Sequence, residues 1–303
     1  MKFLFRNALG RERTPSLFGI AACTTIVIAL LAARAPSAHA GEAPQRVLSI
    51  GSAITEIIFA LGEQDRLVGR DSTSTYPDAA LALPDVGYMR ALAPEGVLSI
   101  RPDLIVASEG SGPPETIEVL KSASIRFVEV PERHSADGVD ESIRIVAKAM
   151  DAEEKGAELR RAFAAQMVAL AATVGGIENR KHVLFILSMQ DGRILAAGRH
   201  TAADGMIGLA GAENAIAGYD GYKQLTDEAL LAADPDVVLM MDRGGEFAID
   251  DATLWSHPGL KTTTAARNKA VIRMNGSYLL GFGPRTAAAA LDLAKALYGD
   301  DLR

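Results

Sequence analysis

The segment Gly87-Tyr88-Met89-Arg90 combines residue types that are suited to binding a hard metal ion. The phenolate of a tyrosine is a hard anionic oxygen donor, and such donors favour ferric iron. A free tyrosine has a pKa of about 10, so ligation needs help with the loss of the proton, from the metal and from a cation such as Arg90. Gly87 permits an unusual backbone angle that would expose the ring. By themselves these residues favour the plainer interpretation of a half-buried turn tyrosine beside a surface arginine.

Motifs that mark the common enzyme classes are absent from the sequence. It contains no Gly-x-Ser-x-Gly, His-Glu-x-x-His, Cys-x-x-Cys or phosphate-binding loop motif. The segment Gly281 to Thr286 begins like a dinucleotide-binding loop, but it lacks the third glycine and its proline removes an amide donor. The histidines after residue 40 show no metal-ligand spacing: His134, His182, His200 and His257. These absences argue against an enzyme.

The first 40 residues have the pattern of a secretory signal peptide. Basic residues precede an apolar run from Leu17 to Ala33, and Ala38-His39-Ala40 offers small residues where a signal peptidase cleaves. The run is near the lower length limit for a membrane span. Cys23 lies in a box typical of lipoproteins, but the apolar run continues beyond it. We therefore expect cleavage after residue 40, loss of Cys23, and a periplasmic product without a membrane anchor.

The remaining chain, residues 41–303, is acidic and contains no cysteine. The first 40 residues hold five basic residues and one acidic residue, so 26 Lys and Arg remain against 37 Asp and Glu, a net charge of −11. This charge argues against nucleic acid and anionic membrane surfaces as partners. The lack of cysteine excludes disulfides and thiolate metal sites. We expect a soluble monomer, long enough for two lobes with separate cores.

Short apolar runs alternate with helical spacing in two parts of the chain, which is typical of parallel βα units. The expected strands are 46–51, 104–108 and 126–130 in the first part, and 182–187, 237–241 and 270–274 in the second. The expected helices are 55–61, 201–210 and 285–297. The predicted fold class is therefore α/β, with two lobes.

Residues 137–175 lie between the two lobes and carry apolar residues at helical spacing, from Val139 to Leu170. A single helix of about 35 residues would be about 50 Å long, and it would act as a rigid strut. The alternative is two ordinary helices broken near Gly156. The predicted boundaries are a signal peptide at 1–40, a first lobe at 41–136, a linking helix at 137–175 and a second lobe at 176–303.

An internal repeat relates the two lobes. In Glu95 to Asp103 and in Glu228 to Asp236, a glutamate precedes proline by seven residues and aspartate by eight, and an apolar strand follows. The Pro-Asp pair ends a short helix and turns the chain into the strand. The repeat predicts duplicated lobes related by a pseudo-twofold axis. Chance similarity of a common helix-to-strand turn is the alternative.

Residues 49–56 and both copies of the repeat resemble the periplasmic binding proteins of the cobalamin, siderophore and haem importers. The segments Val86 to Leu92 and Leu195 to Asp204 are similar to the haem branch of that family. The resemblance covers essentially all of the chain after residue 40. It implies two Rossmann-like lobes bridged by one long helix, with the ligand in the cleft between them.

The resemblance also implies the function. The protein would capture ferric haem in the periplasm and deliver it to an ABC permease dimer with its ATPase subunits. A carrier of cobalamin or of a ferric siderophore would use the same fold. A periplasmic enzyme on the same scaffold is an alternative of another class, since a fold alone does not exclude activity.

Within this resemblance Tyr88 is the expected axial ligand of the haem iron, with Arg90 as the supporting cation. Further residues expected to support the propionates and the porphyrin face are Arg243, Arg285, Tyr278 and Phe282. Arg243 follows an expected strand at the end where open α/β sheets place ligands. Solvated arginines and core aromatics are the alternatives for these four positions.

The second lobe offers Met189 and His200 as candidates for the far side of the iron. A thioether pairs poorly with ferric iron that a phenolate already binds. Thr201 is expected to cap a helix, which would leave the ring of His200 in solvent. We therefore expect a five-coordinate, high-spin ferric haem. The resemblance also implies that Glu95 and Glu228, at equivalent points of the two lobes, dock on arginines of the permease.

Overall fold

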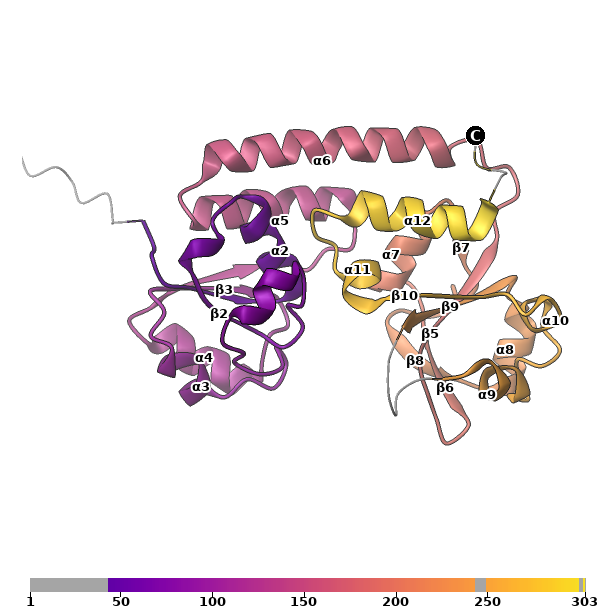
Figure 1. Ribbon diagram of the computed structural model, residues 1–303. Coiled ribbons are helices and arrows are strands. Elements are labelled where there is room, and N and C mark those ends of the chain that lie inside the picture. Colours follow the sequence, from indigo (N-terminus) through magenta and orange to yellow (C-terminus); the bar gives the residue numbers. More distant parts are fainter. Residues whose placement is uncertain (1–42, 243–248, 300–301, 303) are drawn as a thin grey trace, which may run out of the picture. The chain divides into compact units, whose positions relative to one another are not determined.

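The computed structural model describes residues 43–242, 249–299 and 302, and Pro44–Arg303 form one compact unit. Two α/β lobes make up this unit, as the sequence predicted (Figure 1). The predicted signal peptide and Cys23 lie outside the described residues. None of the helices that the structure describes is both long enough and apolar enough to cross a membrane.

The first lobe is built on a parallel four-stranded sheet in the order β2-β1-β3-β4. Its strands are β1 (Val47–Ile50), β2 (Leu67–Arg70), β3 (Leu104–Ser108) and β4 (Arg126–Val130). Its helical elements are α2 (Ser52–Ala60), η1 (Gln64–Arg66), η2 (Asp78–Ala82), α3 (Pro94–Ser99), α4 (Pro114–Ser122) and α5 (Ala136–Ala149). The central strands β1 and β3 are buried almost throughout, which explains their continuous apolar runs.

The second lobe contains a mixed sheet in the order β10-β9-β5-β6-β8, with β7 paired to β5. Its strands are β5 (His182–Gln190), β6 (Arg193–Ala197), β7 (Glu213–Asn214), β8 (Tyr222–Leu225), β9 (Val237–Asp242) and β10 (Val271–Asn275). Its helices are α7 (Ala202–Leu209), α8 (Asp227–Ala233), α9 (Asp251–Ser256), α10 (Thr264–Asn268), α11 (Gly276–Leu280) and α12 (Thr286–Tyr298). The parallel part, β5, β9 and β10, matches the predicted strands.

The antiparallel strands of the second lobe were not predicted. β5 and β6 form a hairpin whose two turn residues, Asp191 and Gly192, both have positive φ. An Asp-Gly pair between apolar strands is a strong hairpin signal, because this turn needs positive φ at both positions. The sequence therefore carried the information for β6, although its strand pattern was not recognised.

The internal repeat corresponds to equivalent structure in the two lobes. Asp103 accepts hydrogen bonds from the backbone N–H groups of Gln45 and Arg46, at 2.8 and 3.0 Å, just before β1. Asp236 accepts one from the N–H of His182, at 2.8 Å, at the start of β5. In each lobe the repeated aspartate thus ties the strand that it precedes to the first strand of the sheet. This shared role supports duplication over chance similarity.

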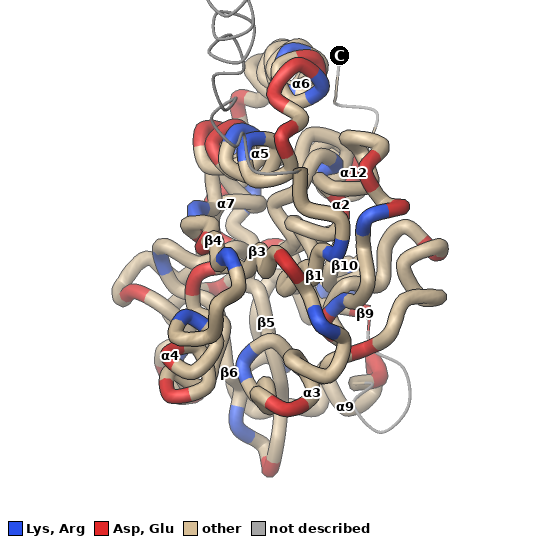
Figure 2. The backbone as a smooth tube through the Cα atoms, turned by 90° about the vertical axis from the view of Figure 1, so that its left-hand side faces the viewer, with Lys and Arg blue, Asp and Glu red and all other residues tan. Residues whose placement is uncertain are grey.

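The single helix predicted for residues 137–175 is wrong in extent. The chain forms α5, which ends at Ala149, and α6 (Glu153–Val174), and Asp151 between them has a φ of 52°. The 22 residues of α6 span about 33 Å. It packs on α5 of the first lobe and on α12 of the second, so it is the long helix that bridges the lobes (Figures 1 and 2).

The alternative of two helices is confirmed, but the break lies at Asp151 and Gly156 is a packing point within α6. A Cβ at Gly156 would lie 2.4 Å from the Cβ of Ala147, so α6 and α5 meet too closely for a side chain. Arg160 of α6 also donates two hydrogen bonds to the carboxylate of Asp140 on α5, at 2.8 and 2.6 Å. The chain therefore turns back at Asp151 because α6 packs along α5.

Candidate functional site

The predicted ligand, Tyr88, lies in the loop that follows β2 and is 48 % exposed. Gly87 has a φ of 99°, in the region that favours glycine, as expected from the sequence. The carbonyl of Tyr88 accepts the N–H of Ala91 at 2.8 Å, and that of Met89 accepts the N–H of Gly112 at 2.9 Å. The ring is therefore presented outward from a main chain that is held at consecutive residues.

The Tyr88 loop faces the space between the two lobes. A small cavity is lined from the first lobe by Ala53, Met89 and His134 and from the second lobe by Leu280 and Phe282. Met89, next to Tyr88, therefore borders residues of both lobes. The loop also follows the carboxyl end of a parallel strand, where α/β sheets bind ligands.

Arg90 lies within electrostatic range of both lobes. Glu132 of the first lobe has a lowered pKa, mainly because His134 donates a hydrogen bond to it, and Arg90 adds to this effect. Arg90 also acts on the phenol of Tyr222, in the second lobe. Among the described residues its guanidinium forms no ion pair or side-chain hydrogen bond. The group is thus exposed and available to an anion near Tyr88.

Tyr222 is a residue of this region that the sequence reasoning missed. Its pKa is raised, mainly because the phenol is partly withdrawn from water. The pair Gly221-Tyr222 repeats the pair Gly87-Tyr88, and both glycines have positive φ. This repetition is the signal that would have identified Tyr222.

Arg285 does not project as a free cation for a propionate. Its Nε and Nη2 donate to Oε2 of Glu56, at 2.9 and 2.8 Å, and its backbone N–H donates to Oε1 at 3.0 Å. Glu56 lies on α2 of the first lobe and is 8 % exposed. The guanidinium also lies 3.4 Å from the ring centroid of Tyr76. Arg285 therefore joins the two lobes, and no local sequence pattern indicated Glu56 as its partner.

The two predicted aromatic residues also belong to this joint between the lobes. Phe282 is buried and makes an edge contact with His134 across the lobes, with ring centroids 5.2 Å apart. Tyr278 donates a hydrogen bond to Asp292 at 2.9 Å, and its pKa is raised by burial and then by that carboxylate. Its ring also lies 4.9 Å from the guanidinium of Arg285. Packing positions both rings, and Phe282 also lines the cavity between the lobes.

The joint gives a first prediction, for stability. Arg285→Met should lower the free energy of unfolding by about 3 kcal/mol, because it leaves the carboxylate of Glu56 buried without its partner. Urea unfolding would measure the loss. Lys295→Met is the matched control, since Lys295 lies on the same stretch of chain and its pair with Asp292, at 3.6 Å, is exposed; its effect should stay below about 1 kcal/mol. Equal effects of the two variants would contradict the assignment.

Met189 lines a cavity of about 480 Å³ in the second lobe, at the carboxyl ends of β5 and β9. Its neighbours in the wall include Leu187, Met241 and Arg273. His200 has a φ of 60° and a side chain that is 79 % exposed, with Nε2 3.8 Å from Asp220. Its ring is largely in solvent, but His200 also lines an open pocket of about 290 Å³ with Glu132 and His134 of the first lobe. Each of the two candidates therefore borders a cavity. The predicted Arg243 lies outside the described residues.

The predicted docking residues lie on equivalent helices. Glu95 is in the first turn of α3, which leads into β3, and Glu228 is in the first turn of α8, which leads into β9. Both residues are exposed. Hydrogen bonds from its own backbone N–H and from the Thr226 hydroxyl lower the pKa of Glu228, which keeps its carboxylate charged. Each lobe thus exposes one glutamate at an equivalent position.

Comparisons with known proteins agree on the class of the fold. A model of the family described as "Periplasmic binding protein" matches residues 47–278. The periplasmic haem-binding protein BhuT, solved in complex with two haems, aligns with a TM-score of 0.80 and 44 % identity, over 83 % of this chain and 97 % of BhuT.

Two relatives found by sequence are named as binding proteins. YvrC of Bacillus subtilis, an uncharacterised ABC transporter substrate-binding lipoprotein, is 29 % identical over 265 residues, 86 % of this chain and 82 % of YvrC. The vitamin B12-binding protein of Vibrio parahaemolyticus is 26 % identical over 261 residues, 84 % of this chain and 90 % of that protein.

Proposed function

Because the chain belongs to the periplasmic binding protein family, we propose that it captures ferric haem between its lobes and delivers it to an ABC importer. The observation that carries this proposal is the exposed ring of Tyr88, which follows Gly87 at a φ of 99° and precedes Met89, a residue that lines the cavity between the lobes, with Arg90 two residues away. A phenolate beside a cation is suited to binding ferric iron. The similarity to BhuT, which was solved with haem, supports the same ligand.

The rest of the haem would meet the second lobe. The cavity at the ends of β5 and β9 offers apolar walls for a porphyrin edge, and Arg273 in its wall offers a cation. Arg273 is also paired with Asp251 at 2.8 Å, so a propionate would compete with that carboxylate. Arg90 is therefore the better candidate partner for a propionate or for the phenolate itself.

The partners and location follow from the proposed role. We expect the mature protein to work as a periplasmic monomer, released by cleavage after Ala40 and without an anchor, and to hand haem to a permease dimer with its ATPase subunits. The similarity to a binding protein of an ABC transporter supports the importer. Because that relative is a lipoprotein, the mass of the mature N-terminus, measured on exported protein, is the test of the unanchored form.

Titration of the purified protein with ferric haem tests the ligand. The Soret band should shift, and a phenolate-to-iron charge-transfer band should grow to saturation at a fixed stoichiometry. The vitamin B12-binding relative makes cobalamin the second candidate. A carrier of cobalamin would leave the haem spectrum as in buffer and would bind cobalamin instead, which would overturn the proposal. The enzyme alternative loses its support because the family consists of binding proteins.

The coordination of the iron gives a second prediction. Electron paramagnetic resonance of the ferric complex should show an axial high-spin signal, because the His200 ring is 79 % exposed with Nε2 beside Asp220 and the thioether of Met189 is a poor ligand for ferric iron. His200→Ala and Met189→Leu should each leave this signal unchanged. A dominant low-spin signal that disappears in either variant would identify that residue as a sixth ligand.

A further inference from the structure

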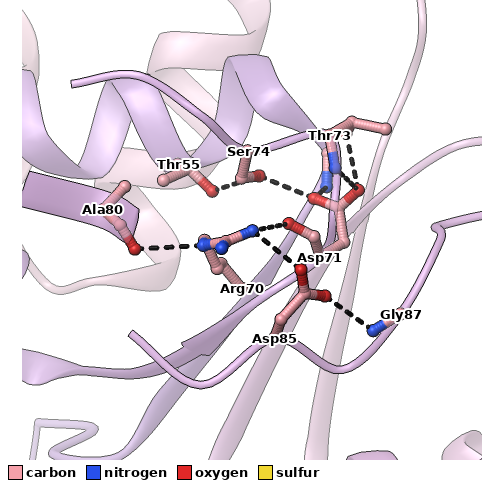
Figure 3. Close-up of polar contacts among 9 residues, drawn as sticks. Thr55, Arg70, Asp71, Thr73, Ser74, Ala80, Asp85 and Gly87 are labelled. Atoms are coloured by element: carbon pink, nitrogen blue, oxygen red, sulfur yellow. Dashed lines mark hydrogen bonds and ion pairs between the residues drawn. The ribbon is translucent and has the colours of Figure 1, made fainter. Parts of the chain in front are cut away.

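A polar network lies under the Tyr88 loop, and Arg70 is at its centre (Figure 3). Arg70 is the last residue of β2 and is only 7 % exposed. Its Nε donates to the carbonyl of Ala80 at 3.0 Å, and its Nη1 donates to the carbonyl of Asp71 at 2.9 Å. The same Nη1 donates to the carboxylate of Asp85 at 3.1 Å. A buried guanidinium is thus fixed from three sides.

Asp85 connects this guanidinium to the residue that precedes Tyr88. One carboxylate oxygen, Oδ2, is bound by Arg70, and the other, Oδ1, accepts the N–H of Gly87 at 2.8 Å. The carbonyl of Gly87 accepts the N–H of Ser72 at 2.9 Å. Both polar backbone groups of Gly87 are therefore held while its φ stays at 99°.

The network is anchored in the core of the first lobe. Asp71 is fully buried, and its Oδ1 accepts the N–H of Gly51 at 2.9 Å and the hydroxyl of Ser74 at 2.6 Å. Thr55 of α2 donates to the Ser74 hydroxyl at 2.7 Å. Hydrogen bonds therefore run without interruption from the start of α2, through Asp71 and Arg70, to the Asp85 carboxylate (Figure 3).

The ion pair with Arg70 does not by itself explain the role of Asp85. Its side chain is 42 % exposed, and a pair that is this open to water contributes little to stability. The hydrogen bond to Gly87 is of another kind, since a carboxylate that accepts a backbone N–H makes a strong, directional contact. What Asp85 fixes is therefore the direction in which the main chain enters Tyr88.

We propose that Asp85, backed by Arg70, is a positioning residue that holds Tyr88 in the direction required for binding the haem iron. This inference rests on the proposed function, ligation by Tyr88. Asp85 acts through the backbone of Gly87 and does not touch the haem. Residues that orient a metal ligand from behind commonly change metal affinity by about 10- to 100-fold when they are removed.

The test uses Asp85→Ala and Asp85→Asn in the mature protein loaded with ferric haem. Asp78→Ala is the matched control, because Asp78 is an exposed aspartate in the first turn of η2, between β2 and Tyr88, and its side chain forms no hydrogen bond or ion pair with other described residues. Two quantities are measured: the rate of haem transfer to excess apomyoglobin, and the energy and width of the phenolate-to-iron charge-transfer band.

We expect Asp85→Ala to release haem about tenfold faster, with a broader and shifted charge-transfer band, because the phenolate then samples several orientations. Asp85→Asn keeps an oxygen that can accept the N–H of Gly87 but loses the ion pair with Arg70, so it should fall between the alanine variant and the wild type. Asp78→Ala should match the wild type in both quantities.

Two results would overturn the inference, and they are distinguishable. If Asp85→Ala lowers the urea midpoint but leaves the band and the release rate unchanged, Asp85 serves only the fold, while ligation by Tyr88 stands. If Tyr88→Phe itself keeps the charge-transfer band, the proposed function fails, and the role of Asp85 fails with it.

Discussion

Tyr88→Phe is expected to weaken the binding of ferric haem by more than about a hundredfold, since changes behind a metal ligand already cost up to that much. The substitution removes the donor oxygen and keeps the ring. Because the side chain is half exposed, the free energy of unfolding should change by less than about 0.5 kcal/mol. Haem titration should show no phenolate-to-iron charge-transfer band.

Tyr76→Phe is the matched control for this experiment. Tyr76 is similarly exposed, at 43 %, and belongs to the same loop, but its ring packs on Arg285 at the joint between the lobes. The loss of the Tyr76 hydroxyl should leave the haem titration unchanged. Wild-type affinity and spectrum in Tyr88→Phe would refute ligation by this residue. Loss of haem binding in both variants would show that the effect is not specific to Tyr88.

Alanine at both Glu95 and Glu228 is expected to reduce haem import, in vesicles that contain the cognate permease, to below about one tenth of the wild-type rate. The two acids are exposed in the first turns of equivalent helices, one in each lobe. Charges at the rim of an interface act mainly on encounter and register. Haem affinity should stay unchanged, because neither residue lines the cavities described above.

The control for docking removes two charges from comparable positions. Glu115 and Glu154 also lie in the first turns of helices, α4 and α6, so Glu115→Ala/Glu154→Ala has the same net charge as the docking variant. It should import haem at the wild-type rate. Similar losses in the two double variants would mean that overall charge matters and that Glu95 and Glu228 have no special role.

The predicted parts of the fold are those that local sequence determines. Buried strands such as β1 and β5 appear as continuous apolar runs, and the repeated Pro-Asp turn marks equivalent points of both lobes. β2 was missed because a four-residue strand that contains glycine and arginine shows no clear pattern. The break between α5 and α6 accompanies the packing of α6 along α5, where Gly156 meets Ala147, and helical spacing does not reveal this contact.

The site was predictable to a different degree at each residue. The presence of Gly87 indicated from the sequence that Tyr88 is exposed, because the positive φ that a glycine permits is a local property of the chain. Arg285 was misjudged because its partner, Glu56, is 229 positions away in the chain. Tyr278 lies beside Arg285 and Phe282 lines the cavity between the lobes, so contact of these two rings with the ligand stays a prediction. Long-range pairing of this kind requires the fold itself.

The joint made by Glu56 and Arg285 has a consequence for how the rate of import depends on the amount of the protein. Together with α6, it fixes the separation of the two lobes, so empty and loaded molecules would show the permease the same spacing between Glu95 and Glu228. A permease that recognises this spacing would bind both forms, and the empty form would act as a competitive inhibitor. When the protein is present in excess over haem, each added copy would be empty. It would then slow import by occupying the permease.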